Sequence, residues 1–437
     1  MLSNAFLYGN PVPYTSFIGR TKELRRIISR IVSHGECTAL IGDPNIGKTS
    51  LLNYIVSNET RNNIFQRNAE NLLFSQIDVH MLGSQFTPNH FWKYSLKPMK
   101  EQIVNKSMYS DIARHYDICR KNYFGNFTLE TLFVALRKLG KRFVLLIDEF
   151  DALLYHPALN NAEFYGGLRS LASRSQGSFA LVIASRTPLS DLNKLTQEFN
   201  PTGSPFFNIF SEVSLGPLMD KDLTKLFSFA GNKFTKHDKY DIHRLSGNHP
   251  YILQAACVFM CEAIEDGVLC RKQYVSKRLH KELKLFFNET WNIWSPEMRK
   301  AFTTIAIDNQ THLLEYKKCF SKKVFESLGK WGPELEDLND KGMIAKDESF
   351  NCGYRVIPEI MLTWLADEIV KVSRATPPFE TWLHEKGLDG AFLSIGEKNF
   401  FKKLIKHTST VLGQGAISII EGFGKGVGEG FGKKIIV

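Results

Sequence analysis

One segment constrains the fold of this chain more than any other: positions 42–49 read Gly-Asp-Pro-Asn-Ile-Gly-Lys-Thr. The apolar run 38–41 precedes it and the helical pattern 50–55 follows it, so its context is strand, loop and helix. In such a loop the backbone N–H groups converge on a phosphate, Lys48 reaches the β- and γ-phosphate oxygens, and the Thr49 hydroxyl is placed to bind Mg²⁺. The nucleotide-binding residues predicted from this loop are Gly42, Asn45, Ile46, Gly47, Lys48, Thr49 and Ser50.

A second motif supplies the acidic groups that a phosphate loop lacks. The run 143–147 is apolar enough for a buried strand and is followed by two carboxylates, Asp148 and Glu149. We expect Asp148 to hold the metal through water and Glu149 to activate the attacking water. Alone, each motif is also compatible with a glycine turn or an acidic strand end. Together, in this order, they predict Mg²⁺-dependent hydrolysis of a nucleoside triphosphate, with Thr49 and Asp148 as the metal residues.

Composition narrows the class of protein further. The 437 residues carry a net charge of +10, and their apolar (43%) and charged (23%) fractions are those of an ordinary globular chain of several domains. Seven cysteines without a Cys-x-x-Cys pair predict neither a disulfide framework nor a zinc site. No signal-peptide pattern and no apolar run of membrane-spanning length is found. We expect a cytoplasmic protein, whose charge allows nucleic acid or an anionic membrane as a partner.

The first half of the chain alternates apolar strands with helical stretches, for example 91–104 and 129–139. This alternation predicts an α/β fold of the P-loop NTPase type, in which helices cover both faces of a parallel sheet and ligands bind at the carboxyl ends of the strands. The predicted strands are Cys37–Ile41, Leu72–Val79, Phe143–Ile147, Phe179–Ala184 and Asn208–Val213.

After residue 215 the pattern becomes helical, with helices expected at 220–229, 236–245, 250–264 and 273–287. Three further helices and a hairpin then form the pattern of a winged helix, at 298–307, 323–328, 333–339, and 343–346 against 354–357, followed by a helix at 358–372. The predicted domains are an NTPase domain at 1–215, a helical lid at 216–289, a winged-helix domain at 290–372, and a linker with a glycine-rich tail at 373–437.

Several further segments resemble one family of ATPases. The stretch 17–24 contains Gly-Arg-x-x-Glu-Leu before the phosphate loop, 185–189 follows a strand, and 246–251 contains Gly-x-His-Pro-Tyr. As an ordered set across residues 4–372, these motifs resemble those of STAND and archaeal-type AAA+ ATPases. The resemblance implies an ATP-binding domain followed by a helical lid and a winged helix.

The resemblance also implies roles for residues outside the two motifs. Gly19 and Arg20 would border the adenine pocket, although Arg20 is equally suited to pair with Glu23 at a helix start. Pro250 would pack on the base, unless it only begins a helix. The Ser185 hydroxyl would touch the γ-phosphate or the attacking water, unless it only closes a strand-end turn. The predicted catalytic residues are Lys48, Glu149, Ser185 and Arg186, and the candidates for an arginine finger from a neighbouring subunit are Arg169, Arg174 and Arg186.

The C-terminal tail differs in composition from the rest of the chain. A basic amphipathic stretch, 400–406, precedes 411–437, where glycine recurs at every second position from Gly422 to Gly432. With a period of four this is a glycine zipper that lets helices approach closely in lipid, and with a period of two it is a strand suited to stacking of identical chains. A flexible end without function is the remaining alternative.

These patterns favour an ATP-driven molecular switch of the STAND type, which oligomerises on activation and hydrolyses ATP slowly. Residues 411–437 would give its output at an anionic membrane or through self-assembly. The resemblance points to bacterial or archaeal signalling or antiviral defence. One alternative is a DNA-associated AAA+ ATPase of the replication or transposition loader type, but acidic residues surround the lysines of the expected recognition helix, 323–330. A membrane-bound ATPase with the tail as a permanent anchor is another.

Overall fold

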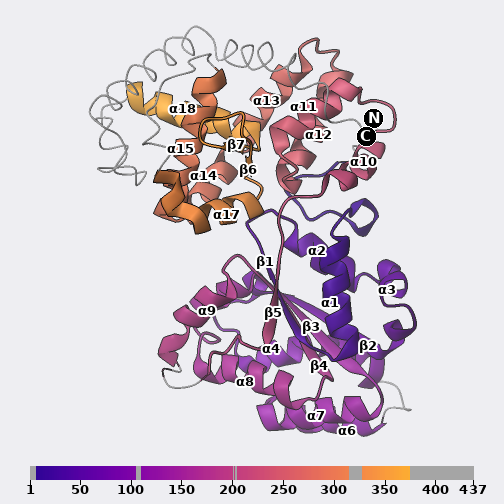
Figure 1. Ribbon diagram of the computed structural model, residues 1–437. Coiled ribbons are helices and arrows are strands. Elements are labelled where there is room, and N and C mark those ends of the chain that lie inside the picture. The colour runs from indigo at the N-terminus through magenta and orange to yellow at the C-terminus, as the bar shows by residue number, and fades with distance from the viewer. Residues whose placement is uncertain (1–5, 105–109, 200, 202–203, 314–326, 375–437) are drawn as a thin grey trace. The chain divides into compact units, whose positions relative to one another are not determined.

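The computed structural model describes residues 6–104, 110–199, 201, 204–313 and 327–374 (Figure 1). The chain divides into two compact units, one of residues 10–215 and the other of residues 1–9 with 216–437. The predicted linker and tail from 375 on, and the predicted helix 323–328 up to residue 326, lie outside the described residues. No described helix is both long and apolar enough to cross a membrane.

A five-stranded parallel sheet forms the centre of the unit 10–215 (Figure 1). The strands lie in the order β2-β3-β4-β1-β5, and each neighbouring pair is parallel. This confirms the predicted α/β fold, and all five strands begin and end within two residues of the predicted positions. Their bounds are β1 Cys37–Ile41, β2 Leu72–Asp78, β3 Arg142–Asp148, β4 Phe179–Ser185 and β5 Phe210–Ser214.

Helices cover this sheet on both faces. The α-helices of the unit are α1 (Thr21–Ser33), α2 (Lys48–Val56), α3 (Asn58–Phe65), α4 (Pro88–Ser95), α5 (Lys97–Met99), α6 (Ser110–Lys121), α7 (Asn126–Lys138), α8 (Ala162–Arg174) and α9 (Leu189–Leu195). Short helical turns are η1 (Tyr14–Ser16), η2 (Gln66–Asn71), η3 (Val79–Met81), η4 (Lys100–Val104), η6 (Phe150–Tyr155) and η7 (Gln197–Phe199).

Strand β3 shows why a central strand of this sheet has to be apolar along its length. Its Phe143, Leu145 and Ile147 belong to one buried cluster, which α4, α6, α7 and α8 also line. Its Val144 and Leu146 belong to a second cluster, lined by α1, α2 and α3. Because successive side chains point to opposite faces of a sheet, one strand contributes to two cores.

The predicted helix 91–104 is wrong in its extent. In the structure α4 begins earlier, at Pro88, where Thr87 and His90 form a capping box, and it ends at Ser95. Pro98 lies in the next turn, where its ring and its missing N–H interrupt a continuous helix. The remaining residues therefore form the short α5 and the π-helical turn η4 instead.

The described part of the other unit is helical apart from the antiparallel hairpin of β6 and β7 (Figure 1). Its described elements are α10 (Asp220–Ser228), α11 (Lys236–Ser246), α12 (Pro250–Glu265), α13 (Arg271–Glu282), α14 (Lys284–Ile293), α15 (Pro296–Leu313), η8 (Ser327–Trp331), α17 (Gly332–Asp340), β6 (Ile344–Lys346), β7 (Tyr354–Val356) and α18 (Glu359–Arg374).

One prediction for this unit is wrong: residues 273–287 do not form a single helix. They belong to α13 and α14, which are separated at Leu283. Each helix buries its own apolar residues, Val275 and Leu279 on α13 and Phe286 and Phe287 on α14. The other helices and the hairpin lie where they were expected. Because the helix 323–328 falls mostly outside the described residues, the winged helix itself stays a prediction.

Candidate nucleotide-binding site

The phosphate loop joins β1 to α2 and needs glycine at two positions for different reasons. Gly47 has a φ of 98°, a conformation that side chains rarely adopt. At Gly42 a Cβ atom would lie 2.8 Å from Cγ2 of Ile46 and 3.0 Å from the carbonyl oxygen of Leu215. No side chain caps the N-terminus of α2. Its first N–H groups are therefore available to an anion, as a phosphate site requires.

Lys48 is almost fully buried in this loop, with 5% of its surface exposed. Its Nζ donates to the carbonyl oxygens of Gly42, at 2.8 Å, and Asp43, at 3.1 Å. Burial lowers the pKa of Lys48, and the carboxylates of Glu149, Asp151, Asp148 and Asp43, in decreasing order, oppose that shift. The ammonium group therefore lies among acidic side chains and is held by weak neutral acceptors.

Arg20 braces the loop from the side of α1. It has a left-handed backbone conformation with a φ of 61°, as Gly19 does with 70°. Its buried side chain donates from Nη2 to the carbonyl oxygen of Ile46, at 2.9 Å. Its Nη1 lies 3.5 Å from Oε1 of Glu23, so the pairing at the helix start is present as well. The contact of Gly19 and Arg20 with adenine stays a prediction.

Asp148 ends β3 and is 2% exposed. Burial raises its pKa, while hydrogen bonds from the Thr49 hydroxyl and from the backbone N–H of Glu149 (3.0 Å) oppose the shift. The structure thus brings together the two residues predicted to bind the metal. Across the described part of the chain there is no cluster of three or more His, Cys, Asp or Glu residues that could hold a metal ion. The pair fits Mg²⁺ nevertheless, because this ion is usually bound by one or two protein oxygens together with water and phosphates.

Glu149 follows with a left-handed backbone conformation, φ 51°, and 25% of its side chain exposed. Its Oε2 lies 3.8 Å from Nε of Arg186 and 3.9 Å from Nε2 of His80. The predicted catalytic base therefore lies between two basic side chains. His80 was not predicted, although it comes just after β2, whose last residue, Asp78, is paired with Asp148.

Asp151 is a second residue that the sequence analysis missed. It is buried, and its carboxylate accepts from both the backbone N–H and Nε of Arg186, each at 3.3 Å. Arg186, predicted as catalytic or as an arginine finger, thus contacts two acidic residues of its own chain. The sequence Asp-Glu-Phe-Asp at 148–151 was the available signal, since a helical turn after a strand places the last Asp near the first.

The remaining predicted residues have other surroundings. Ser185 is buried. Its Oγ donates to the Thr187 carbonyl at 2.9 Å and accepts from the Thr187 N–H at 3.0 Å, so it closes a turn at the end of β4. The backbone carbonyl of Ser185 accepts from the N–H of Gly42. Two arginines lie on α8: Arg169 donates to the carbonyl of Ser204 at 3.2 Å and Arg174 pairs with Glu130 at 3.0 Å. Pro250 begins α12 in the other unit. Their roles stay predictions.

Comparison with solved structures finds distant similarities. The solved structures that it resembles include a Walker-type ATPase of Pyrococcus abyssi, with a TM-score of 0.46, 16% identity, and coverage of 80% of this chain and 96% of that one. They also include the Aeropyrum pernix ORC2 protein in ADPNP–ADP complexes (0.42, 13%, 81% and 96%) and Drosophila ORC bound to DNA (0.43, 15%, 82% and 89%). At these values the similarities do not bear on function. No curated protein matches the chain significantly.

The family model described as Novel STAND NTPase 2 matches residues 39–276, which run from β1 into α13. The matched residues include the phosphate loop, Asp148 at the end of β3, and Glu149. This match spans more than half of the 437 residues. It confirms the resemblance drawn from the motifs, and the chain belongs to the Novel STAND NTPase 2 family.

Proposed function

We propose that this STAND NTPase is a molecular switch that binds ATP with Mg²⁺, oligomerises in the ATP state and returns to the resting state by slow hydrolysis. One observation carries the proposal. Lys48, the Thr49–Asp148 pair and Glu149 lie together at the carboxyl edge of the sheet, and Glu149 is engaged by Arg186 and His80. The groups that we expect to take part in hydrolysis lie close together, but the expected base is paired.

ATP binding changes the partners of Lys48. In the structure its ammonium group is held by two carbonyl oxygens of the loop. The β- and γ-phosphate oxygens are charged acceptors, and hydrogen bonds to charged groups are stronger than those to neutral ones. Lys48 therefore turns from the loop carbonyls to the phosphates, while the first N–H groups of α2 bind the phosphates at the N-terminus of this helix.

The metal residues act with this step. Mg²⁺, when bound, neutralises charge on the phosphates and favours the transfer of the γ-phosphoryl group. Thr49 and Asp148 are suited to hold it because the hydroxyl and the buried carboxylate are already adjacent and hard cations take oxygen ligands. The two side chains would give up their mutual hydrogen bond to hold the ion.

Glu149 takes the proton of the attacking water. In the resting state its carboxylate contacts Arg186 and His80, so it has to leave these partners to act as a base. Arg186 is then free to approach the γ-phosphate, still guided by Asp151. Its position favours Arg186 over Arg169 and Arg174, whose hydrogen-bond partners are Ser204 and Glu130. Breaking both contacts adds at most about 2 kcal/mol to the barrier, which is one contribution to slow hydrolysis.

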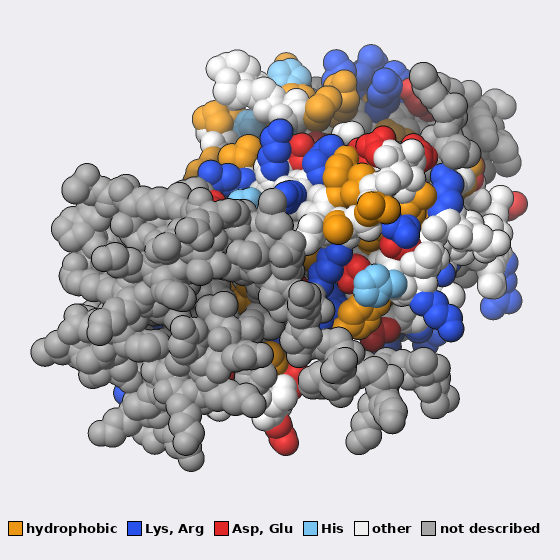
Figure 2. All heavy atoms as spheres, turned by 90° about the horizontal axis from the view of Figure 1, so that it is seen from above, with side chains coloured by type: hydrophobic (Ala, Val, Ile, Leu, Met, Phe, Trp, Pro, Cys, Tyr) orange, Lys and Arg blue, Asp and Glu red, His pale blue; other side chains and the backbone are white. Residues whose placement is uncertain are grey.

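Oligomerisation in the ATP state would bring the segments 411–437 together, with the output at an anionic membrane or through self-assembly. The family membership supports a regulatory NTPase, and we extend it to bacterial or archaeal signalling or defence. A DNA-associated ATPase is the less favoured function. On the face seen in Figure 2 Lys and Arg side chains are dispersed among acidic and apolar ones, whereas binding to DNA phosphates depends on clustered cations.

The test measures nucleotide binding and assembly together. Lys48→Ala should weaken ATP binding by at least about tenfold, because it removes charge-assisted hydrogen bonds, while Lys93→Ala, an exposed lysine on α4, should bind as the wild type does. In light scattering after size-exclusion chromatography, wild-type protein and Glu149→Gln should form a defined multimer with ATP and remain smaller with ADP. The ATPase rate per subunit should rise with protein concentration. A monomer in every nucleotide state, with a rate independent of concentration, would leave a self-contained NTPase and refute the switch.

A further inference from the structure

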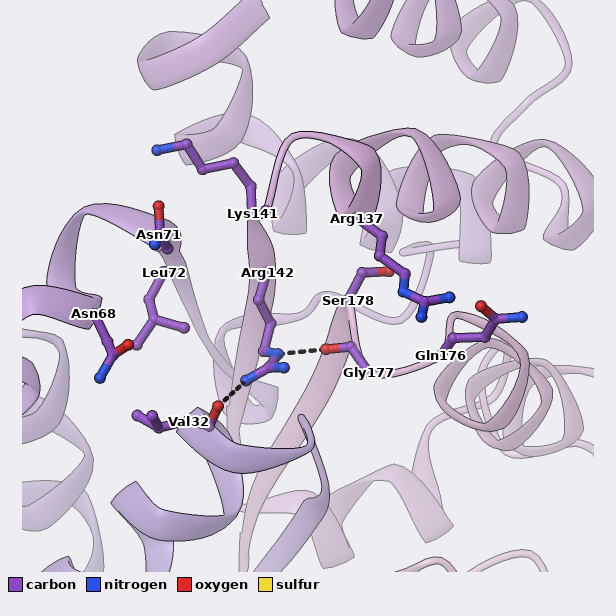
Figure 3. Close-up of a pocket in the computed structure, with 11 residues that line it drawn as sticks. Val32, Asn68, Asn71, Leu72, Arg137, Lys141, Arg142, Gln176, Gly177 and Ser178 are labelled. Carbon is purple, nitrogen blue, oxygen red and sulfur yellow. Dashed lines mark hydrogen bonds between the residues drawn. The ribbon is translucent and has the colours of Figure 1, made fainter.

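A cavity of about 200 Å³ opens at the amino-terminal edge of the sheet in the unit 10–215 (Figure 3). It lies where β2 and β3 begin, at Leu72 and Arg142, and beside the turn 176–178 that leads into β4. The ends of α1 and α7 complete it, with Val32 and Arg137. Because the phosphate loop and Glu149 follow the other ends of the strands, this cavity and the nucleotide site are separated by the length of the sheet. For the seven residues of β3 this is about 20 Å.

The lining of the cavity is basic and rich in hydrogen-bond donors. It contains three cations, Arg137, Lys141 and Arg142, and no aspartate or glutamate. Figure 3 shows Arg137 reaching in from α7 and Arg142 from the start of β3. The other polar side chains of the lining are Asn68, Asn71, Gln176 and Ser178.

Arg142 is a fixed cation in this wall. Its Nε donates to the carbonyl oxygen of Gly177, and its Nη1 donates to those of Ile31 and of Val32, the latter at 2.9 Å. These bonds tie two segments of the chain, the end of α1 and the turn before β4, to one guanidinium group. Burial lowers its pKa, but an arginine remains charged at neutral pH. Among the described residues its Nη2 has no hydrogen-bond partner, so one edge of a fixed, half-buried cation faces the cavity.

The other two cations differ in how they are held. The Nζ of Lys141 donates to the carbonyl of Glu70 at 2.7 Å. The guanidinium of Arg137 has neither an ion pair nor a hydrogen bond among the described residues, and its neighbour Lys138 does not line the cavity. Three positive charges thus share one concave site without a compensating carboxylate in its lining, an arrangement that an anion would stabilise.

We propose that this cavity binds a small phosphate-bearing anion. Guanidinium groups bind oxyanions such as phosphate through paired N–H donors. Arg137 offers such a pair, and Arg142 adds its Nη2. The volume of about 200 Å³ corresponds to about seven water molecules at about 30 Å³ each. This is below the range of about 300–1,000 Å³ for pockets that enclose drug-sized ligands. The ligand is therefore inorganic phosphate or the phosphate group of a small molecule, and the site does not enclose a whole nucleotide.

The test uses the full chain with its nucleotide site saturated by ADP, which fills the positions of the α- and β-phosphates. Because the γ-phosphate position stays open, bound phosphate is assigned to the cavity by its dependence on Arg137. Titration with inorganic phosphate in a calorimeter should give one site per chain that depends on Arg137. Its affinity should fall as salt is added, because Arg137 is exposed and Lys141 and Arg142 are half-buried. Arg137→Gln should weaken binding by about tenfold or more. The matched control, Lys138→Gln, removes the same charge from the next position of α7 and should bind phosphate as the wild type does.

Two outcomes would overturn the proposal. One is the absence of saturable phosphate binding to the ADP-loaded wild type, or equal affinities for Arg137→Gln and Lys138→Gln. The other comes from a second arm with a fluorescent DNA duplex. Duplex binding that Arg137→Gln weakens, without any binding of inorganic phosphate, would make this edge of the sheet a nucleic-acid surface instead. An unchanged melting temperature of Arg137→Gln would confirm that lost binding is not lost folding.

Discussion

Replacing Glu149 by glutamine tests the centre of the proposed chemistry. The change keeps the shape of the side chain and removes the carboxylate that we expect to take a proton from the attacking water. A general base contributes a factor of about 10² to 10⁴ to a rate, which corresponds to about 2.7–5.5 kcal/mol of activation free energy. Glu149→Gln should therefore bind ATP as the wild type does and lose at least about 99% of its turnover.

The same substitution should hardly change stability. Glu149 gives up its ion pair with Arg186 at 3.8 Å and its contact with His80 at 3.9 Å, and the exposed fractions of these partners are 41% and 61%. Pairs this long and this exposed contribute between zero and about 1 kcal/mol each, since water and salt screen them. We expect the free energy of unfolding without nucleotide to change by about 1 kcal/mol or less. The two magnitudes separate a catalytic effect from a loss of folded protein.

The assay is single-turnover phosphate release from ATP, run beside nucleotide binding and urea unfolding. Glu163→Gln is the control, because it removes a carboxylate from an exposed position at the start of α8. A turnover of Glu149→Gln within about threefold of the wild type would exclude Glu149 as the base. A loss of turnover that matches a loss of folded protein would show that the side chain is structural.

Three other predictions concern packing, ionisation and the tail. Gly35→Ala should destabilise the protein by about 1–3 kcal/mol more than Gly140→Ala in urea unfolding. Both residues have a φ of +66°, but only at Gly35 would the new Cβ meet a backbone oxygen, that of Gly177, at 2.1 Å. Equal losses of stability would contradict the clash. Burial raises the pKa of Cys37 from 9.0 to about 12, so the folded state keeps a proton that the unfolded state loses. The contribution of this proton to the free energy of unfolding is present below pH 9.0 and is lost as the pH rises towards 12, by up to about 1.4 kcal/mol per pH unit. The stability of Cys37→Ala should therefore decline less steeply with pH in this range. Parallel declines would mean that Cys37 ionises in the folded state. Deleting residues 411–437 should leave the ATP affinity and the melting temperature unchanged. If the tail forms membrane helices, the deletion should abolish ATP-dependent leakage of anionic liposomes, and if it forms stacked strands, it should abolish binding of an amyloid dye. Undiminished output in cells would leave the tail without function.

The strands and the phosphate loop could be predicted because their signals are local. A buried parallel strand has to be apolar on both faces, and a loop that binds phosphate has to carry glycine, lysine and a hydroxyl at fixed spacing. These requirements are met by consecutive residues, such as 143–149 and 42–49. The error in the predicted helix 91–104 had a local cause as well, because Pro98 is visible in the sequence and interrupts that helix.

The surroundings of Glu149 were not predictable in the same way. Its contacts with His80 and Arg186 join three strand ends that are separated by about seventy and by about forty positions in the chain. They depend on β3 lying between β2 and β4, and on the register that pairs Asp78 with Asp148. No local pattern encodes that register, since it follows from how all the side chains on both faces pack.

The sequence by itself therefore determined that this chain forms a nucleotide site on a parallel sheet. The reason is that the strand, the phosphate loop and the carboxylates are each specified by a short run of consecutive residues. Only the tertiary structure decided which charges surround the base, and only it assembled the basic cavity from α1, η2, α7, β3 and the turn before β4. The physical reason is that ion pairs and cavities depend on distances between residues remote in sequence, and those distances are set by the packing of the whole unit.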